Sequence, residues 1–573
     1  IIVSPNSIFG FLKTYRLFID NKEMSEKADF IQKEFGKIFE DISRFSERFG
    51  NIDKRNTQLS EDFRKLQISV DAITNRANRI KDLEFDKKRF VGNEEKTMNL
   101  AIWDIESSSA STDFGSIIEI GGVLVNENFQ ELDRFNFRCR LPEGEIPQAM
   151  ALIVNKTSIK QLTHGNLSHY QMLGEVEKIF KKWSPSIFLG WSNIGFDDEM
   201  IRKEFFKGIR YPYITNASPN KRHDGINIAR AAYAVDPSVL ETEINEKNNP
   251  VFKLESLSRM QGLDSSDAHS ALTDSILTSK ILEIIKKKQP STWDMFLRTG
   301  NKSDTETIFK KEDIITLNEY FYGKSRLYLC APLHPKHCIH PIYNWGQAVD
   351  LRVDVEPLLN MSINELRVEM KKTPKFLRTI RSNKAPIILD AKYGMEVEPY
   401  NAMDKSLILK RAKLVKENEK FSQNILTALR EIAEEKEQSK SQEDIYAEES
   451  IYQKFTSNKD TSLFPSWHAA SWKDKLSLLD KFDDERLIGF GKKIIYQESP
   501  ETLPKDMLKS IKRSIAKRIL SEKAEKWWTV STCYNEIDTL RDKYSNENDH
   551  EKLKFLDELN NYVMSIQKKY ENS

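Results

Sequence analysis

The sequence has few cysteines, almost no net charge and no long apolar run. Its four cysteines are widely scattered along 573 residues, which excludes the disulfide framework of a small secreted domain and favours a reducing cytoplasm. The chain has 88 lysines and arginines and 87 aspartates and glutamates, so as a whole it is not a strongly basic nucleic-acid binder. This balance does not exclude a local basic groove. No secretory signal and no membrane-spanning run occur, so we expect no membrane partner.

The length leaves room for several domains. From Asn99 the alternation of strand-like and helical patterns predicts an α/β domain, followed by short strands after residue 292 and by helices after residue 404. The expected strands lie at 116–126, 134–141, 327–330, 346–350 and 386–389, and the first expected helices at 147–163 and 170–183. The highly charged stretch 434–448 is expected to be a solvated, mobile connection.

A first candidate site follows an apolar run of strand length. Leu100 to Trp103 predict a buried strand, and Asp104 and Glu106 follow it at a spacing of two. Residues i and i+2 point to the same face of a strand, so these carboxylates repel each other unless a cation lies between them. Hard oxygen ligands of this kind suit Mg²⁺ or Mn²⁺. Taken alone, the pattern is also that of a half-exposed strand.

Two later segments add acidic residues and a histidine. Asp197 and Asp198 follow Asn193, a turn or helix N-cap residue, and fall in the first turn of an expected helix, where acids also complement the helix dipole. His269 and Asp274 are five residues apart, about 140° of rotation on a helix, so they would flank one face. Each segment alone has an ordinary structural explanation.

Together the three segments resemble the DnaQ-like, DEDDh family of 3′→5′ exonucleases. The family pattern is Asp-x-Glu, then Asn-x-x-Phe-Asp, then His-x-x-x-x-Asp, and the positions that match it are Asp104, Glu106, Asp197, His269 and Asp274. Further sequence segments, from roughly residue 98 to the C-terminus, resemble the exonuclease I family. The segments that carry this likeness are 191–199, 230–234, 252–257, 333–335 and 354–359.

This resemblance implies a fold and a function. The fold is α/β, with an RNase H-like (DnaQ-like) exonuclease core at 97–290, an SH3-like β domain at 291–404 and a C-terminal helical domain at 405–573. The function is a 3′→5′ exodeoxyribonuclease that degrades single-stranded DNA to nucleotide monophosphates in DNA repair or recombination. The implied partners are the 3′ end of single-stranded DNA and a single-stranded DNA-binding protein.

The resemblance also implies site residues. Two Mg²⁺ ions, for which Mn²⁺ can substitute, would be held by Asp104, Glu106, Asp197 and Asp274, with Asp104 shared and His269 as general base. Implied substrate contacts are Glu106, Ala149 and Leu152. Two further contacts are expected from position, because a cation and an aromatic ring after the second segment suit phosphate neutralisation and base stacking. They are Arg202 and Tyr213, whereas Phe206 is expected in the core and a solvated Arg202 is the alternative.

Two other functions stay open. One is a 3′→5′ exoribonuclease of the same family, because no contact to a 2′-hydroxyl is visible in the sequence. The other is a coiled-coil interaction protein with an accessory nuclease domain. Since all five matching positions are intact, the enzyme is favoured.

The first ninety residues carry a different pattern. Apolar residues at 31–80 alternate steps of four and three over seven repeats, which is the seam of a coiled coil with Asn56 as its polar member. A helical hairpin with a turn near Gly50 explains the pattern equally well. The chain begins at Ile1 rather than methionine, so we expect a fragment or the tail of a longer polypeptide.

Residues 1–91 form the expected helical or coiled-coil segment, and they resemble the C-terminal tail of the RmuC family of DNA-recombination proteins. The phrase Val3-Ser-Pro-Asn-Ser7 and the phenylalanine-rich seam carry this likeness. It implies no catalytic residue, and it is consistent with self-association or with an RmuC-like partner through residues 31–80. A natural fusion and a read-through of neighbouring genes both stay open.

A histidine-rich stretch invites a zinc interpretation. His334, His337, Cys338 and His340 lie within seven residues, but no second pair of ligands at a distance completes a structural site. The expectation is therefore that zinc is absent from this stretch.

Overall fold

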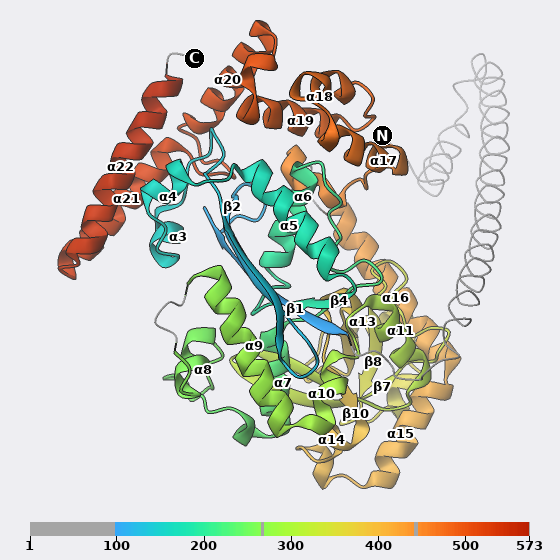
Figure 1. The fold of residues 1–573 in the computed structure, drawn as a ribbon. Helices are drawn as coiled ribbons and strands as arrows, with labels where there is room; N and C mark the ends of the chain where they lie inside the picture. The colour runs from blue at the N-terminus through green and yellow to red at the C-terminus, as the bar shows by residue number, and fades with distance from the viewer. Residues whose placement is uncertain (1–97, 265–268, 440–444, 572–573) are drawn as a thin grey trace, which may run out of the picture. The chain divides into compact units, whose positions relative to one another are not determined.

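The computed structural model describes residues 98–264, 269–439 and 445–571 (Figure 1). The chain divides into two compact units, Ile1–Lys96 and Thr97–Ser573, and the second unit is described below. The expected coiled coil at 31–80, its hairpin alternative and the segment that resembles RmuC lie outside the described residues. All four cysteines are buried and unpaired, as expected. None of the helices within the described ranges is long and apolar enough to cross a bilayer.

A five-stranded mixed sheet begins the second unit. Its strands are β1 (Asn99–Ser107), β2 (Ile117–Val125), β3 (Glu131–Arg138), β4 (Ser186–Leu189) and β5 (Lys221–Arg222). They lie in the order β3-β2-β1-β4-β5, with β1 antiparallel to β2 and parallel to β4. All nine residues of β2 are buried, because the strand is almost entirely apolar and lies in the interior of the sheet.

Helices cover both faces of this sheet (Figure 1). They are α3 (Ala149–Val154), α4 (Ile159–His164), α5 (His169–Trp183), α6 (Asp197–Lys207), α7 (Gly225–Val235), α8 (Leu254–Met260), α9 (Ala271–Lys288) and α10 (Pro290–Leu297), with the 3₁₀ helix η1 (Pro237–Val239). The next helix, α11 (Lys302–Lys311), contributes Ile308 and Phe309 to the core of a second sheet instead. On β1, Ala101, Trp103 and Ile105 pack with α5 and α6, whereas Leu100 and Ile102 pack with α7 and α9. Side chains alternate along a strand, so the residues after Ile102 at even positions point toward α9.

A second five-stranded sheet has its own core. Its strands are β6 (Ile315–Phe321), β7 (Lys324–Pro332), β8 (Gly346–Asp350), β9 (Leu377–Ile380) and β10 (Ile388–Asp390), in the antiparallel order β10-β6-β7-β8-β9. Around it lie α12 (Glu356–Leu359), α13 (Ile363–Glu369), α14 (Ala391–Met395), α15 (Lys405–Glu417), α16 (Glu419–Gln438), η2 (Ser382–Lys384) and η3 (Tyr400–Ala402). Apolar side chains of α15 and α16 belong to this core.

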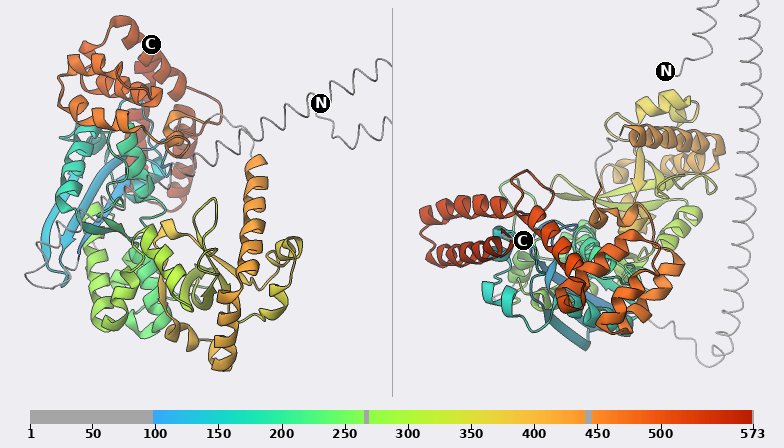
Figure 2. Two further views of the ribbon diagram at one scale, coloured as in Figure 1. Left: turned by 90° about the vertical axis from the view of Figure 1, so that its right-hand side faces the viewer. Right: turned by 90° about the horizontal axis from the view of Figure 1, so that it is seen from above.

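The remaining helices pack beside the first sheet. They are α17 (Asn458–Ala469), α18 (Trp472–Leu479), α19 (Glu485–Glu498), α20 (Lys505–Ile519), α21 (Val530–Asn546), α22 (His550–Tyr570), η4 (Ala447–Tyr452) and η5 (Pro500–Thr502). Their apolar faces share one core with α3, α4 and α6. The left view of Figure 2 shows these orange and red helices next to the blue strands and away from the yellow strands of the second sheet.

The expected strands and most expected helices are confirmed, with three corrections. The helix expected at 147–163 is two helices, because Ser158 begins α4 with a capping box. Of the two alternatives for Asn193, the turn is confirmed and the N-cap is wrong, because the N-cap of α6 is Phe196. The described residues of the charged stretch 434–448 have defined places: the first of them end α16, and Glu448 in η4 forms an ion pair with Arg518 at 2.6 Å. The division at 290/291 and 404/405 stays a prediction.

Candidate active site

Strand β1 aims two carboxylates at the start of α9. Asp104 and Glu106 lie on the face of β1 that packs against α7 and α9, and they pair across the sheet with Gly121 and Glu119 of β2. Both side chains are partly buried. The expectation of two carboxylates on one face at the end of a strand is thus met in the geometry.

Gly121 allows α9 to approach these carboxylates. A Cβ atom at Gly121 would lie 2.5 Å from the backbone nitrogen of Leu272, closer than any side chain tolerates. The Ser275 hydroxyl donates a hydrogen bond to the Gly121 carbonyl at 3.2 Å, which fixes the first turn of α9 on β2. As a result Asp274 reaches the β1 pair, and the ligand atoms of Asp104, Glu106 and Asp274 lie within 4.8 Å of one another.

Asp197 approaches the same pocket from the first turn of α6. The backbone N–H of Ile105, between the two β1 carboxylates, donates to Asp197 Oδ1 at 3.3 Å. Asp197 is 6% exposed, and its charge contributes to the raised pKa of Asp104. It is not among the three carboxylates whose ligand atoms converge within 4.8 Å. The structure therefore places all four predicted acids in one pocket, three of them in direct reach of each other.

The electrostatics of the pocket oppose ionisation. Burial, with the neighbouring carboxylates, raises the pKa of Glu106 to about 9 and that of Asp197 to about 8. Burial also raises the pKa of Asp274, and burial with the charges of the other acids raises the pKa of Asp104 well above its ordinary value. Arg138 donates to Glu119 at 2.8 Å. Its positive charge lowers the pKa of Glu106, but this effect is smaller than the increase caused by burial and the neighbouring acids. The four acids thus lack sufficient positive charge from the protein itself.

The donor set fits a hard divalent cation. Each of the four residues offers only carboxylate oxygens, which are the ligands that Mg²⁺ and Mn²⁺ prefer. A bound cation would also supply the charge that the pocket lacks, because an opposite charge within a few ångströms favours the ionised carboxylate. Asp104, Glu106 and Asp274 are the residues that are already close enough to share one ion.

His269 lies beside the pocket, but not on α9 as expected. The helix begins at Ala271, and His269 precedes it with a left-handed backbone (φ +73°), a conformation in which histidine is enriched. Its backbone N–H donates to Asp274 Oδ1 at 3.3 Å, so it is anchored to a pocket carboxylate. Its ring points to Glu255 of α8, with Nε2 3.9 Å from Glu255 Oε2.

The two expected contacts on α3 are core residues. Ala149 and Leu152 are both 0% exposed and pack against the C-terminal helices. The backbone N–H groups of Ala149 and Met150 donate to the Glu536 carboxylate of α21 at 2.7 and 3.2 Å, so this acid caps the start of α3. A contact of these two side chains with substrate stays a prediction. Neither side chain is accessible to a substrate in this conformation, because both are fully buried.

Arg202 and Tyr213 lie together, but Arg202 is already engaged. Arg202 is 6% exposed, so its interpretation as a solvated surface residue is wrong. Its guanidinium donates to Glu199 at 3.1 Å and to the Tyr452 hydroxyl at 2.7 Å, and it lies 5.4 Å from the centre of the Tyr213 ring. These partners neutralise Arg202 in this conformation, and its role in phosphate binding stays a prediction. Phe206 lies in the core, as expected.

Two further polar residues near the pocket were not predicted as site residues, although Asn193 was expected in a structural role. Glu119 faces Glu106 across the strand pair, is 4% exposed and accepts a hydrogen bond from the Ser270 hydroxyl next to His269. Its signal was a single acid inside the apolar run of β2. Asn193 is fully buried, and neither atom of its amide has a hydrogen-bond partner among the described residues. Its signal was its place in the Asn-x-x-Phe-Asp pattern.

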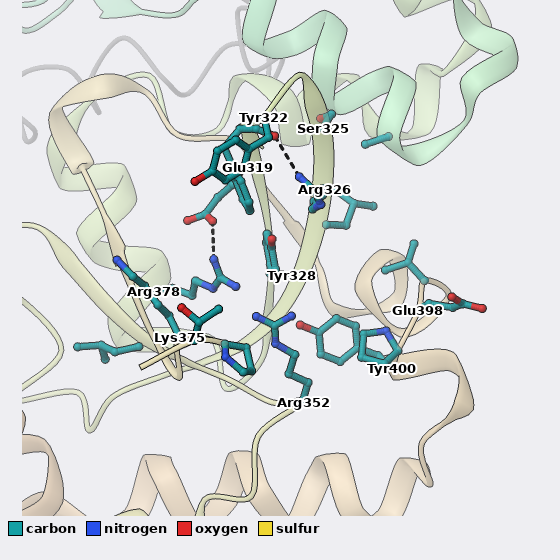
Figure 3. Close-up of a pocket in the computed structure, with 18 of the residues that line it drawn as sticks. Glu319, Tyr322, Ser325, Arg326, Tyr328, Arg352, Lys375, Arg378, Glu398 and Tyr400 are labelled. Carbon is teal, nitrogen blue, oxygen red and sulfur yellow. Dashed lines mark hydrogen bonds and ion pairs between the residues drawn. The ribbon is translucent and has the colours of Figure 1, made fainter. Parts of the chain in front are cut away.

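A separate cationic cavity lies on the second sheet (Figure 3). It has a volume of about 1040 Å³, and its charged lining comprises Glu319, Arg326, Arg352, Lys375, Arg378 and Glu398. The guanidinium of Arg378 lies 3.6 Å from the centre of the Tyr328 ring and donates to Glu319 at 2.8 Å. The four cations outnumber the two acids, so the cavity suits an anionic ligand.

Comparisons with known proteins place this arrangement in context. Residues 443–566 match the family model of the exonuclease I C-terminal domain, and residues 1–89 match that of the RmuC family. Exodeoxyribonuclease I of Buchnera aphidicola subsp. Acyrthosiphon pisum is 25% identical over 347 residues, which are 58% of this chain and 82% of that protein. The structure of E. coli exonuclease I with a dA16 oligonucleotide has a TM-score of 0.68 at 19% identity, and covers 82% of this chain and 100% of that one.

This chain is similar to exonuclease I. An ExoI/SSB-Ct complex also matches, with a TM-score of 0.67 at 19% identity over 82% of this chain and 99% of that one. The predicted resemblances to the exonuclease I and RmuC families are confirmed. The predicted α/β fold, a nuclease core with SH3-like and helical parts, is confirmed by the exonuclease I structures.

The raised pKa values predict a stability change for Glu106→Gln. A carboxyl whose folded pKa is raised from 4.5 to about 9 contributes stability that is lost as the pH rises through that window. In EDTA at pH 8, Glu106→Gln should therefore raise the free energy of unfolding by about 1.4 kcal/mol or more, the equivalent of one pKa unit. At pH 5 the gain should be small. Urea melts at both pH values measure it.

The exposed Glu558 in the middle of α22 provides the control. Glu558→Gln should leave the free energy of unfolding nearly unchanged at both pH values, because the carboxylate is solvated. An equal gain for Glu106→Gln at pH 5 and pH 8 would contradict the assignment of a raised pKa.

Proposed function

We propose that the chain is a 3′→5′ exodeoxyribonuclease that hydrolyses single-stranded DNA to nucleotide monophosphates. The observation that carries this proposal is the gathering of Asp104, Glu106, Asp197 and Asp274 in one pocket without a matching cation from the protein. The exodeoxyribonuclease I relatives and the exonuclease I structures with oligonucleotides support the substrate. A role in DNA repair or recombination and a cytoplasmic location complete the proposal.

The proposed cofactor is a pair of Mg²⁺ ions, for which Mn²⁺ can substitute. The carboxylate-only donor set supports these metals, and a zinc-bound E. coli exonuclease I with single-stranded DNA supports metal dependence. Asp104 would contact both ions, Glu106 and Asp274 the one near the nucleophile, and Asp197 the other. When bound, such ions stabilise the attacking and the leaving oxygens of an in-line displacement.

His269 is the proposed general base. An imidazole is a suitable acceptor for the proton of the attacking water near neutral pH. The hydrogen bond from its backbone to Asp274 fixes the start of the side chain beside the pocket. To act, the ring would turn from Glu255 toward the pocket, and such catalytic contacts often tighten only when substrate binds.

A degradation assay tests the proposal. A single-stranded DNA with a free 3′-hydroxyl and its RNA counterpart are offered to the full chain with Mg²⁺ and with EDTA. We expect DNA to be shortened from the 3′ end with Mg²⁺ only. Asp104→Ala should lower the rate by more than about 100-fold, because even outer-shell partners of metal ligands are worth 10- to 100-fold.

Asp294→Ala is the matched control, since Asp294 is an exposed aspartate of α10. It should keep the wild-type rate. Near wild-type activity of Asp104→Ala would contradict the metal assignment, and faster digestion of the RNA would favour the exoribonuclease alternative.

The acidic C-terminal tail of a single-stranded DNA-binding protein is the proposed protein partner. The ExoI/SSB-Ct complex supports the partner, and the cationic cavity on the second sheet supports the place. Arg352 and Arg378 share the buried Asp350 and flank the Tyr328 ring, so their positions are fixed before a ligand arrives. Lys375 lines the cavity from an exposed position.

Charge reversal at Lys375 tests this docking site. Lys375→Glu should weaken the binding of an acidic tail peptide, measured by fluorescence anisotropy, by roughly tenfold, the equivalent of about 1.4 kcal/mol. Lys554→Glu on the exposed surface of α22 is the control and should change the affinity little. Equal weakening by both variants would show that only the net charge matters and would contradict docking in the cavity.

A further inference from the structure

Two histidines of the β7–β8 loop meet a glutamate from the start of α16. The ligand atoms of His334, His337 and Glu419 lie within 4.8 Å of one another. Nε2 of His337 is 3.1 Å from Glu419 Oε1, and Nε2 of His334 is 3.9 Å from Glu419 Oε2. The sequence argument against zinc looked for a second pair of ligands at a distance, whereas the fold brings in a single third ligand, Glu419, 82 residues from His337.

Buried anchors hold this cluster on both sides. Leu333 and Cys338, which flank the two histidines, are 0% and 1% exposed and belong to the core of the second sheet. The backbone N–H of His334 donates to the hydroxyl of Ser422 at 3.0 Å, and Ser422 is itself fully buried on α16. The loop and the helix are therefore fixed to each other before a ligand binds, which favours a preorganised site.

The other two members of the histidine-rich stretch have different partners. Nδ1 of His340 accepts hydrogen bonds from the backbone N–H groups of Ile342 and Tyr343 at 3.1 and 3.2 Å. Cys338 is buried, and its thiol donates to the Pro335 carbonyl at 3.5 Å. His340 and Cys338 are therefore not part of the cluster.

We propose that His334, His337 and Glu419 form a binding site for a divalent transition metal ion, with Zn²⁺ as its best representative. Two imidazole nitrogens and one carboxylate oxygen are a known zinc ligand set that leaves one position for water. The side chains are 20%, 26% and 40% exposed, so an ion can enter from solvent. The mixed nitrogen and oxygen donors distinguish this site from the oxygen-only pocket around Asp104, which suits Mg²⁺.

The neighbourhood of the cluster gives the binding a recognisable signature. The ammonium of Lys336 is 3.6 Å from Glu419 Oε1 and competes with an incoming cation for that carboxylate. The Lys336 backbone N–H lies 3.4 Å from His334 Nδ1, so in the metal-free ring Nδ1 accepts and Nε2 carries the proton. Metal binding at Nε2 shifts that proton to Nδ1 and gives up this contact.

Calorimetric titration of the full chain with Zn²⁺, in excess Mg²⁺ to occupy the carboxylate pocket, tests the proposal. Wild type should bind one more Zn²⁺ than His337→Asn or Glu419→Gln. His550→Asn is the control, because His550 is an exposed histidine at the start of α22. It should bind Zn²⁺ like wild type. Equal binding by all four proteins would overturn the proposal.

Lys336→Met provides a test with the opposite sign. Removal of the competing ammonium should tighten Zn²⁺ binding by several-fold, whereas an unchanged or weaker affinity would contradict the site. None of these variants should change Mg²⁺-dependent digestion of single-stranded DNA. The zinc proposal therefore fails or holds independently of the proposed exonuclease activity.

Discussion

Burial and mutual repulsion oppose the ionisation of four carboxyl groups, and this cost is the constraint that the rest of the structure has to meet. Asp104, Glu106, Asp197 and Asp274 come from one strand and two helices that are far apart in sequence, and their charges disfavour the arrangement. The surrounding fold has to hold them together. The pairing of β1 with β2 fixes Asp104 and Glu106. Asp197 is the first residue of α6, and Asp274 lies in the first turn of α9.

Several contacts outside the pocket keep those helices in place. The absence of a side chain at Gly121 lets α9 lie directly on β2, and the Ile105 backbone holds the first turn of α6 against β1. Farther away, Glu536 of α21 caps α3, so the C-terminal helices and the part of the chain around the first sheet stabilise each other. The pocket is thus built by the whole unit rather than by its motifs alone.

The alternation of strand and helix patterns predicted an α/β fold, because such patterns are local. The four acids were predicted only through the resemblance of the three segments together to the DEDDh family, since each segment alone has an ordinary structural explanation. Distant contacts were not predictable. Glu119 was an unremarked acid in an apolar strand until β2 paired with β1 and placed it opposite Glu106. Arg202 donates to Tyr452, 250 residues away, and His337 contacts Glu419, 82 residues away. Contacts over such distances leave no periodic pattern in the sequence.

Proton release on metal binding tests the central claim most directly. If burial and mutual repulsion hold the pKa of Asp197 at about 8 and of Glu106 at about 9, the metal-free pocket carries protons at neutral pH. Titration with Mg²⁺ at pH 7.5, in buffers of different ionisation enthalpy, should then show release of at least about one proton per protein. Asp104→Asn should abolish most of that release. Mg²⁺ binding without proton release in the wild-type protein would contradict the account.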